Sequence, residues 1–295
     1  MKFKTTAIAM AVAGTVAAPM AAQADIYASA RVGIENVDTK GVSDLDVHSF
    51  ASRFGAKGET DLGNGMTGFG RYEWDVDLEN GDSIKLRHRY VGVKGDFGSV
   101  TVGQAYHTFY NFLVGPVDNP WWGSGYAMVS YTGRTDKAIT YAGGSGNVAF
   151  GVSAYFAREA DEDAPDGYEV AGSFGIGDMT LAVGVQHFEV IDNDVTGVTL
   201  SGIGAGPVTF GVAYQQNDDD DSLTVEALFG NAYAHLESIN LDASDNNPMA
   251  LTLGYTQSLG RNTTMWYEVV SGDADSGNSD DDLTAVRAVL KYDIM

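Results

Sequence analysis

The sequence predicts an antiparallel β-barrel that spans a membrane. Apolar and polar residues alternate with period two in repeated segments from residue 26 to the C-terminus, so each segment is a two-faced strand. The segments run about 9–12 residues, the length that a tilted membrane-spanning strand needs and longer than the usual ~5–6 of soluble strands. Short glycine-rich turns alternate with longer acidic connections, which is typical of outer-membrane barrels.

The first residues have the features of a secretory signal. Lys2 and Lys4 make a positive start, residues 6–18 are small and apolar, and Ala22-Gln23-Ala24 is an A-x-A cleavage motif. A transmembrane helix is the poorer interpretation, because the apolar run is short and breaks at Pro19. We therefore expect a signal peptide over residues 1–24, export to the cell outer membrane, and a barrel over residues 25–295.

Composition agrees with long paired strands. The chain has 37 glycines and 15 tyrosines, only 6 prolines and no cysteine, so backbone pairing rather than disulfides must hold the fold. The formal net charge of −23 disfavours nucleic-acid binding, which needs a basic surface.

The first segment illustrates the alternation. Ile26, Val32 and Ile34 share one face, and Tyr27 and Arg31 share the other. In a soluble sandwich the apolar face would point inward, whereas in a membrane barrel it faces lipid and the polar face lines the lumen. Strand length, recurrent aromatic residues near the segment ends and the alternating connections favour the membrane barrel.

Sixteen strands are predicted, and fourteen remain an alternative because the pattern is weakest over residues 197–243. The predicted strands start near Ile26, Val47, Met66, Ser83, Ser99, Arg134, Asn147, Tyr168, Met179, Asp194, Pro207, Leu223, Asn231, Met249, Thr263 and Leu283.

The connections differ in length and charge. Acidic loops are predicted at residues 38–46, 75–82, 159–166, 192–194, 216–221, 242–247 and 272–282. They have three interpretations: a negative mouth that concentrates cations, a site for divalent ions that bridge lipopolysaccharide, or a solvated surface. The stretch 105–133 lacks alternation and contains Trp121-Trp122; its length indicates a functional loop, and the lumen is the available place for it.

Four stretches resemble the trimeric general diffusion porins of Gram-negative bacteria. They are Ser52–Gly65, Arg89–Val100, Leu253–Leu259 and the C-terminal Leu290–Met295. The resemblance implies a homotrimer among outer-membrane lipids and lipopolysaccharide, passive diffusion of ions and small hydrophilic solutes, no cofactor and no reaction. The chain departs from the family in ending on Ile294-Met295 rather than phenylalanine, which bears on assembly rather than fold.

The resemblance also implies a constriction, in which acids of an inward loop face basic residues of the wall. Carried over by matching motif, the basic residues are Arg53, Lys85, Arg87 and Arg134, and the loop acid is Asp118. Alternation independently favours a lumen position for these charges, because Arg or Lys on the lipid face near the midplane costs about 2–4 kcal/mol. By alternation, Arg89 would share the face of Lys85 and Arg87.

Ion preference stays open at this stage, because the acidic loops favour cations and the basic constriction favours anions. The alternatives are an outer-membrane barrel enzyme of lipase or protease type and a secreted acidic adhesin. No G-x-S-x-G motif, metal-ligand spacing of the five histidines or short repeat supports them.

Overall fold

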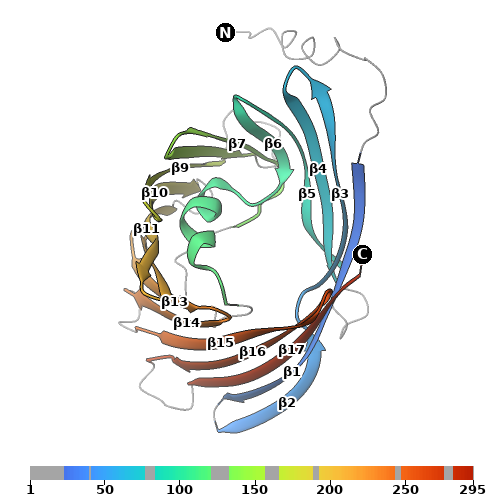
Figure 1. The fold of residues 1–295 in the computed structure, drawn as a ribbon. Coiled ribbons are helices and arrows are strands. Elements are labelled where there is room, and N and C mark those ends of the chain that lie inside the picture. The colour runs from blue at the N-terminus through green and yellow to red at the C-terminus, as the bar shows by residue number, and fades with distance from the viewer. Residues whose placement is uncertain are drawn as a thin grey trace.

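The computed structural model describes residues 23–39, 41–76, 84–120, 133–156, 166–188, 193–242, 247–275 and 282–294. Within these ranges the chain forms one closed antiparallel barrel (Figure 1). Most of the predicted signal peptide, residues 1–22, lies outside them, as do most residues of several predicted acidic loops. No helix in the described part of the chain is long and apolar enough to cross a bilayer.

Every strand of the barrel pairs with its sequence neighbour, and β1 closes the ring by pairing with β17 from Ala28↔Ile294 to Thr39↔Leu283. The strand segments are β1 (Gln23–Thr39), β2 (Val42–Ser49), β3 (Ser52–Gly63), β4 (Met66–Val76), β5 (Ile84–Gly95), β6 (Gly98–Gln104), β7 (Ala138–Ser145), β8 (Val148–Tyr155), β9 (Gly167–Ile176), β10 (Met179–Phe188), β11 (Asn193–Ala205), β12 (Val208–Gln216), β13 (Asp220–Phe229), β14 (Ala232–Leu241), β15 (Met249–Gly260), β16 (Thr263–Asp273) and β17 (Leu283–Ile294).

Segments β2 and β3 are two halves of one barrel strand. Both pair with β1, β2 opposite residues 32–39 and β3 opposite residues 23–29, and only Phe50 and Ala51 separate them. Ala51 has a φ of 55°, which breaks the strand locally. The seventeen segments therefore make sixteen barrel strands, and the prediction of sixteen is confirmed.

The prediction of an acidic loop over residues 38–46 is wrong. Residues 38–46 mostly continue the strands of a β1–β2 hairpin, with Glu35 opposite Asp46 and Val37 opposite Asp44. Leu45 and Val47 alternate with these aspartates, so the segment has a strand pattern that its acidic composition concealed.

Tight turns join the strands at the end of the barrel where β1 begins and β17 ends. Asn64 and Gly65, between β3 and β4, both have positive φ (53° and 75°), as a two-residue turn that matches strand twist requires. Asn tolerates this conformation and Gly adopts it without strain, which explains why the Asn-Gly pair marks the turn.

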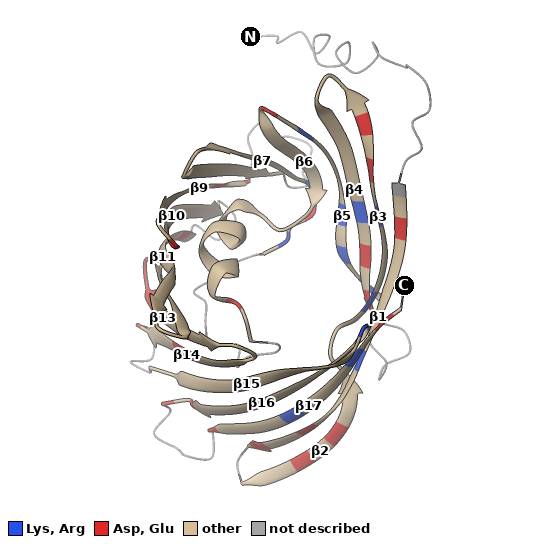
Figure 2. Cartoon of the chain, in the orientation of Figure 1, with Lys and Arg blue, Asp and Glu red and all other residues tan. Residues whose placement is uncertain are grey.

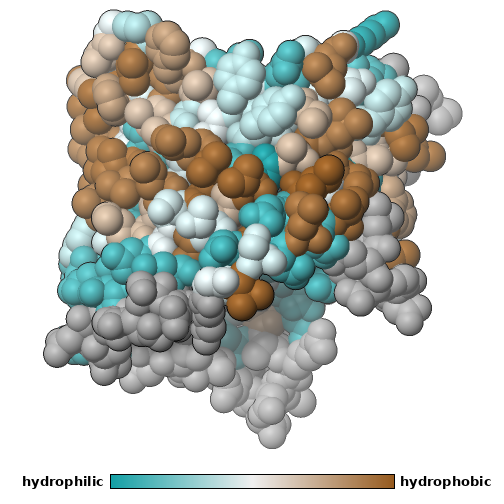
Figure 3. Space-filling model, turned by 90° about the horizontal axis from the view of Figure 1, so that it is seen from below, coloured by the Kyte–Doolittle hydropathy of each residue, from teal (hydrophilic) through white to brown (hydrophobic). Residues whose placement is uncertain are grey.

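The outer surface is apolar. Large hydrophobic side chains at alternate strand positions are exposed, among them Ile26, Val91, Val183 and Leu253. Figure 3 shows hydrophobic residues gathered in a band across one side, with hydrophilic residues along the rim below it. The inner positions are polar, so the barrel has the inside-out arrangement that lipid demands.

After β6 the chain turns into the ring. We call the described residues 105–120 the inward segment; it contains a short π-helix, η1 (Tyr110–Val114), and a 3₁₀ turn, η2 (Gly115–Val117). Both lie inside the barrel in Figure 1, against the wall formed by β9–β13.

Candidate functional site: the barrel lumen

The two sides of the lumen carry opposite charge. Strands β7–β15 contain no Lys or Arg, whereas β1, β3, β4, β5 and β17 all do. Figure 2 shows Lys and Arg along the strands on the side of β1, β3–β5 and β17, facing a side where acids are the charges. We call Arg31, Arg53, Arg71 and Arg87 the basic wall.

Asp75 and Glu73 of β4 hold the basic wall together. Asp75 lies between Arg53 and Arg87, with an Arg53 Nε–Oδ1 distance of 3.6 Å and an Arg87 Nη1–Oδ2 distance of 3.3 Å. Glu73 is almost completely buried; it receives a hydrogen bond from Arg71 and lies 3.1 Å from Arg87 Nε. Arg53 and Arg87 therefore share Asp75 as a neighbour.

A β-bulge in β5 decides which basic residues reach the lumen. Glu73 pairs with His88 but the next residue of β4, Trp74, pairs with Leu86, so Arg87 is the extra residue. Arg87 contacts Glu73 and Asp75 on the inner side, and His88 is buried beside Glu73. A bulge of this kind breaks the period-two rule, because two successive side chains turn the same way.

The prediction that Arg89 shares the face of Lys85 and Arg87 is wrong, because the bulge shifts the alternation by one residue. Beyond it, Arg89 pairs with Tyr72 and has the same parity as Val91, which is 61% exposed on the outer side. The Arg89 side chain lies 3.7 Å from Asp136. Lys85, before the bulge, pairs with Asp75 and has the inward parity, but its side chain is exposed and no contact joins it to the arginines among the interactions found in the described residues.

Arg134 reaches the same region from a different element than predicted. The strand expected to start at Arg134 starts at Ala138, so Arg134 belongs to the return of the loop. Its guanidinium lies over the Tyr106 ring, 5.0 Å from the centroid, and its Nη1 is 3.4 Å from the Tyr106 hydroxyl.

Tyr106 connects the inward segment to the basic wall. Arg87 Nη2 donates to the Tyr106 hydroxyl at 3.0 Å, and the Tyr106 ring stacks on Tyr110 with centroids 4.0 Å apart. Tyr106, Arg87 and Arg134 thus form one polar cluster between the wall and the segment.

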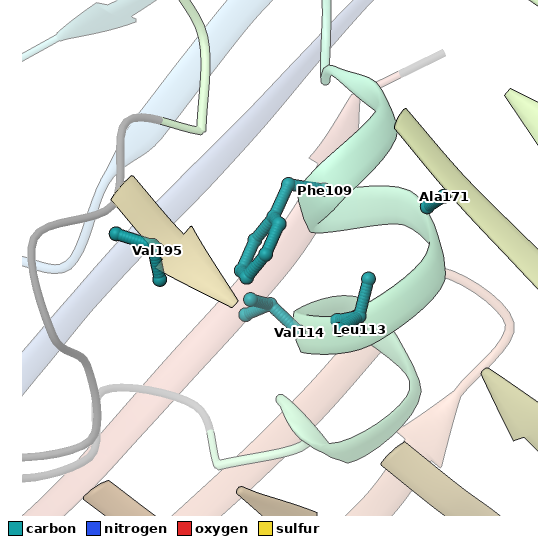
Figure 4. Packing of buried hydrophobic residues seen from close by; sticks show 5 residues of the cluster. All are labelled: Phe109, Leu113, Val114, Ala171 and Val195. Atoms are coloured by element: carbon teal, nitrogen blue, oxygen red, sulfur yellow. The ribbon is translucent and has the colours of Figure 1, made fainter. Parts of the chain in front are cut away.

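The other side of the inward segment is fixed to the opposite wall. The backbone amide of Phe109 donates to buried Glu169 at 2.8 Å, and Thr199 donates to the carbonyl of Leu113 at 2.6 Å. Figure 4 shows Phe109, Leu113 and Val114 of the segment beside Ala171 and Val195 of β9 and β11. Burial of the phenylalanine, leucine and valine side chains contributes roughly 1.5–3 kcal/mol each.

Four glycines make room for the segment. Gly151, Gly184, Gly197 and Gly211, the glycine seat, lie on the inner faces of β8, β10, β11 and β12. A Cβ at Gly184 would lie 2.8 Å from Leu113, at Gly197 2.6 Å from Leu113, and at Gly211 2.8 Å from Val117. Contacts this short would force Leu113 and Val117 or the wall to shift, so the absence of side chains at these glycines makes room for the segment.

Asp118 lies on the acidic side of the lumen. It accepts a hydrogen bond from Tyr110 at 2.9 Å, and its neighbour Asn119 donates to Glu226 at 2.6 Å. Withdrawal of the carboxyl from water raises the pKa of Asp118; the hydrogen bond from Tyr110 opposes that rise, and Glu237 and Glu226 add to it. Asp118 is therefore separate from the arginine cluster, although Tyr110 and Tyr106 link the two.

Sequence reasoning missed Arg71, Glu73, Asp75 and Tyr106 as lumen residues. One signal could have found the basic side: between residues 138 and 260 the only Lys or Arg is Arg158, so the cations had to gather on the remaining strands. Tyr106 carries no comparable signal, because its role depends on how the loop folds. No group of three or more His, Cys, Asp or Glu in the described ranges could hold a metal ion.

Comparisons with known proteins agree with this architecture. A family model described as Gram-negative porin matches residues 5–294. A monosaccharide porin of Halomonas sp is 28% identical over 162 residues, which cover 48% of this chain and 43% of that protein, so the chain spans less than half the length of that relative. The major outer membrane protein P.IB of Neisseria meningitidis serogroup B is 32% identical over 100 residues, 30% of each chain.

Solved structures share the fold at low identity. An anion-selective porin from Comamonas acidovorans has a TM-score of 0.73 at 16% identity, covering 92% of this chain and 100% of that one. Salmonella typhi OmpF has a TM-score of 0.72 at 17% identity, covering 92% and 97%. With a family match over nearly the whole length and a closed sixteen-stranded barrel, the chain belongs to the Gram-negative porin family of the outer membrane.

Proposed function

We propose that the chain forms a water-filled channel through which ions and small hydrophilic solutes diffuse passively, without a chemical reaction, and that residues 105–133 narrow it. The observation that carries the proposal is the contact of Tyr106 with Arg87 and Arg134, which places polar groups of the inward segment against the basic wall. A pore selects by its narrowest part and the charges that line it. The proposed constriction residues are Arg53, Lys85, Arg87, Arg134 and Asp118.

We further propose a preference for anions. Arg53, Arg87 and Arg134 lie at the proposed narrowing, and within the described ranges the carboxylates that pair with Arg53 and Arg87 are those of Asp75 and Glu73. Outer acidic loops act over a longer distance, and screening reduces a charge's influence beyond about 8 Å at physiological salt. The anion selectivity named for the Comamonas porin supports this direction, and the monosaccharide porin of Halomonas supports passage of small polar solutes generally.

The channel test is conductance in planar bilayers. Purified protein should give large stepwise increases in ohmic conductance in KCl. In a tenfold KCl gradient, the sign of the reversal potential should show that chloride is more permeant than potassium. An inserted barrel with no ohmic steps would overturn the channel. Ohmic steps whose reversal potential has the sign for potassium preference would overturn the proposed anion selectivity but not the channel.

A homotrimer embedded among lipids and lipopolysaccharide is the proposed assembly. Support comes from the trimer form of Vibrio cholerae OmpT, which has a TM-score of 0.71 at 16% identity, covering 92% of this chain and 99% of that one. Native mass spectrometry in detergent should give three copies per particle, and a monomer at all concentrations would contradict the assembly.

A further inference from the structure

A cavity of about 700 Å³ lies where β1, β3, β4 and the end of β17 meet. Its lining includes Tyr27, Arg31, Lys57 and Arg71 together with Glu73 and Asp293. The cavity shares Arg53 with the residues proposed for the constriction and extends from the basic wall toward the barrel end that carries the tight turns.

Two like-charged pairs lie directly opposite each other on neighbouring strands, and three of their four residues line the cavity. Lys57 is directly opposite Arg71 in the β3–β4 register, and Arg31 is directly opposite Lys291 in the β1–β17 register. Like charges directly opposite destabilise a sheet. Intramolecular carboxylates offset part of the cost, Glu73 for Arg71 and Asp293 for Lys291 at 2.8 Å.

Tyr27 orders the cations at the cavity. Its hydroxyl donates to Glu73 at 2.8 Å and accepts from Arg71 Nε at 2.8 Å. The Lys57 ammonium lies 5.9 Å and the Arg71 guanidinium 5.5 Å from the centroid of the Tyr27 ring. The Lys57 side chain stays exposed and lies opposite Asp25 in the β1–β3 register, so its charge faces the cavity beside one carboxylate.

We propose that this cavity is a binding site for a hydroxyl-bearing organic anion, whose carboxylate or phosphate lies between Lys57 and Arg71. An anion there relieves the repulsion of the opposed cations, and Asp293 and Ser29 at the cavity provide acceptors for hydroxyls. The volume accommodates a molecule of sugar size rather than a single inorganic ion.

The inference rests on the proposed channel and gives it a solute class. Glu73 contacts both Arg71 and Arg87, so the cavity is contiguous with the arginines at the proposed narrowing. A solute that passes the narrowing meets the cavity next, and a channel with such a site saturates for this class while remaining ohmic for chloride.

Gluconate is the probe, with glucose and acetate as partial probes that carry only the hydroxyls or only the carboxylate. In planar bilayers in KCl, gluconate should reduce the conductance saturably, and equal concentrations of glucose or acetate should not. Lys57→Gln should raise the half-blocking gluconate concentration about fivefold, the order expected for losing one charged contact. Arg261→Gln, which removes an exposed charge from a turn at the same barrel end, is the matched control and should leave it unchanged.

Gluconate that blocks no better than acetate would overturn the site, as would equal block of Lys57→Gln and the unmodified protein. In either case KCl conductance would persist, so the channel would stand. Absence of KCl steps would overturn the channel itself.

Discussion

Arg87 donates a hydrogen bond to the hydroxyl of Tyr106, joining a strand of the barrel wall to the segment that lies inside the barrel. The same hydroxyl lies 3.4 Å from Arg134. One phenol thus orients two guanidiniums, and a hydrogen bond to a charged group contributes about 1.5–3 kcal/mol when buried, less at this partly exposed site.

The bulge in β5 predicts that two neighbouring arginines differ in function. Arg87→Gln should shift the reversal potential in a KCl gradient toward potassium, because it removes a charge from the lumen. Arg89→Gln should leave it unchanged, because Arg89 has the outward parity. Equal shifts for the two variants would show that the bulge is misplaced.

Glu169 should be needed to hold the inward segment. Glu169→Ala leaves the amide of Phe109 without its buried acceptor, at a cost of about 1–3 kcal/mol. We expect larger current fluctuations in single-channel records and a lower urea midpoint in lipid vesicles. Glu169→Gln keeps an acceptor oxygen and should behave closer to the unmodified protein; identical behaviour of Glu169→Ala would contradict the role.

The glycine seat predicts a steric effect at Gly197. Gly197→Ala puts a methyl group 2.6 Å from Leu113, and overpacking of this kind costs about 1–3 kcal/mol. Displacement of the segment into the passage should lower single-channel conductance. Gly204→Ala, on the same strand with nothing within 4 Å, is the control and should change neither conductance nor stability.

Acid pH should increase the anion preference through Asp118. Its raised pKa means that the carboxylate becomes neutral at a higher pH than an ordinary aspartate, whose pKa is about 3.9. Loss of a negative charge from the lumen favours anions, so the reversal potential should move further toward chloride as pH falls through that range. Asp118→Asn should already show, at neutral pH, the reversal potential that the unmodified protein reaches only in acid, and acidification should not change it further. If the reversal potential of the variant still shifted by the full amount in acid, another group would be responsible for the pH dependence.

Most of the barrel could be predicted from the sequence, because alternation is a direct result of strand geometry. Predicted strand starts at Met66, Met179, Met249, Thr263 and Leu283 coincide with the observed ones. Two misplaced features interrupt the alternation, the break at Phe50–Ala51 and the strand expected at Arg134. The hairpin over residues 38–46 keeps the alternation, but its acidic composition resembles that of a loop.

The candidate site was harder to predict. The family resemblance puts Arg53 and Arg87 in one constriction, and alternation favours a lumen face for both. The bulge moves Arg89 from the predicted lumen side to the outward parity, and the period-two pattern does not indicate that the strand contains an extra residue. Tyr106 contacts arginines 19 and 28 positions away, and Glu169 accepts a hydrogen bond from a residue 60 positions away. A local pattern does not encode such contacts.

The glycine seat determines what kind of opening the barrel has. Leu113 and Val117 pack directly against the wall backbone at the glycines. Sideways movement of the inward segment would therefore bring them into steric conflict with neighbouring side chains. The passage left beside it then has dimensions set by the shape of the sheet, in the manner of a rigid sieve. In the proposed channel, we expect the described part of this segment to act as a fixed obstruction that sorts solutes by size.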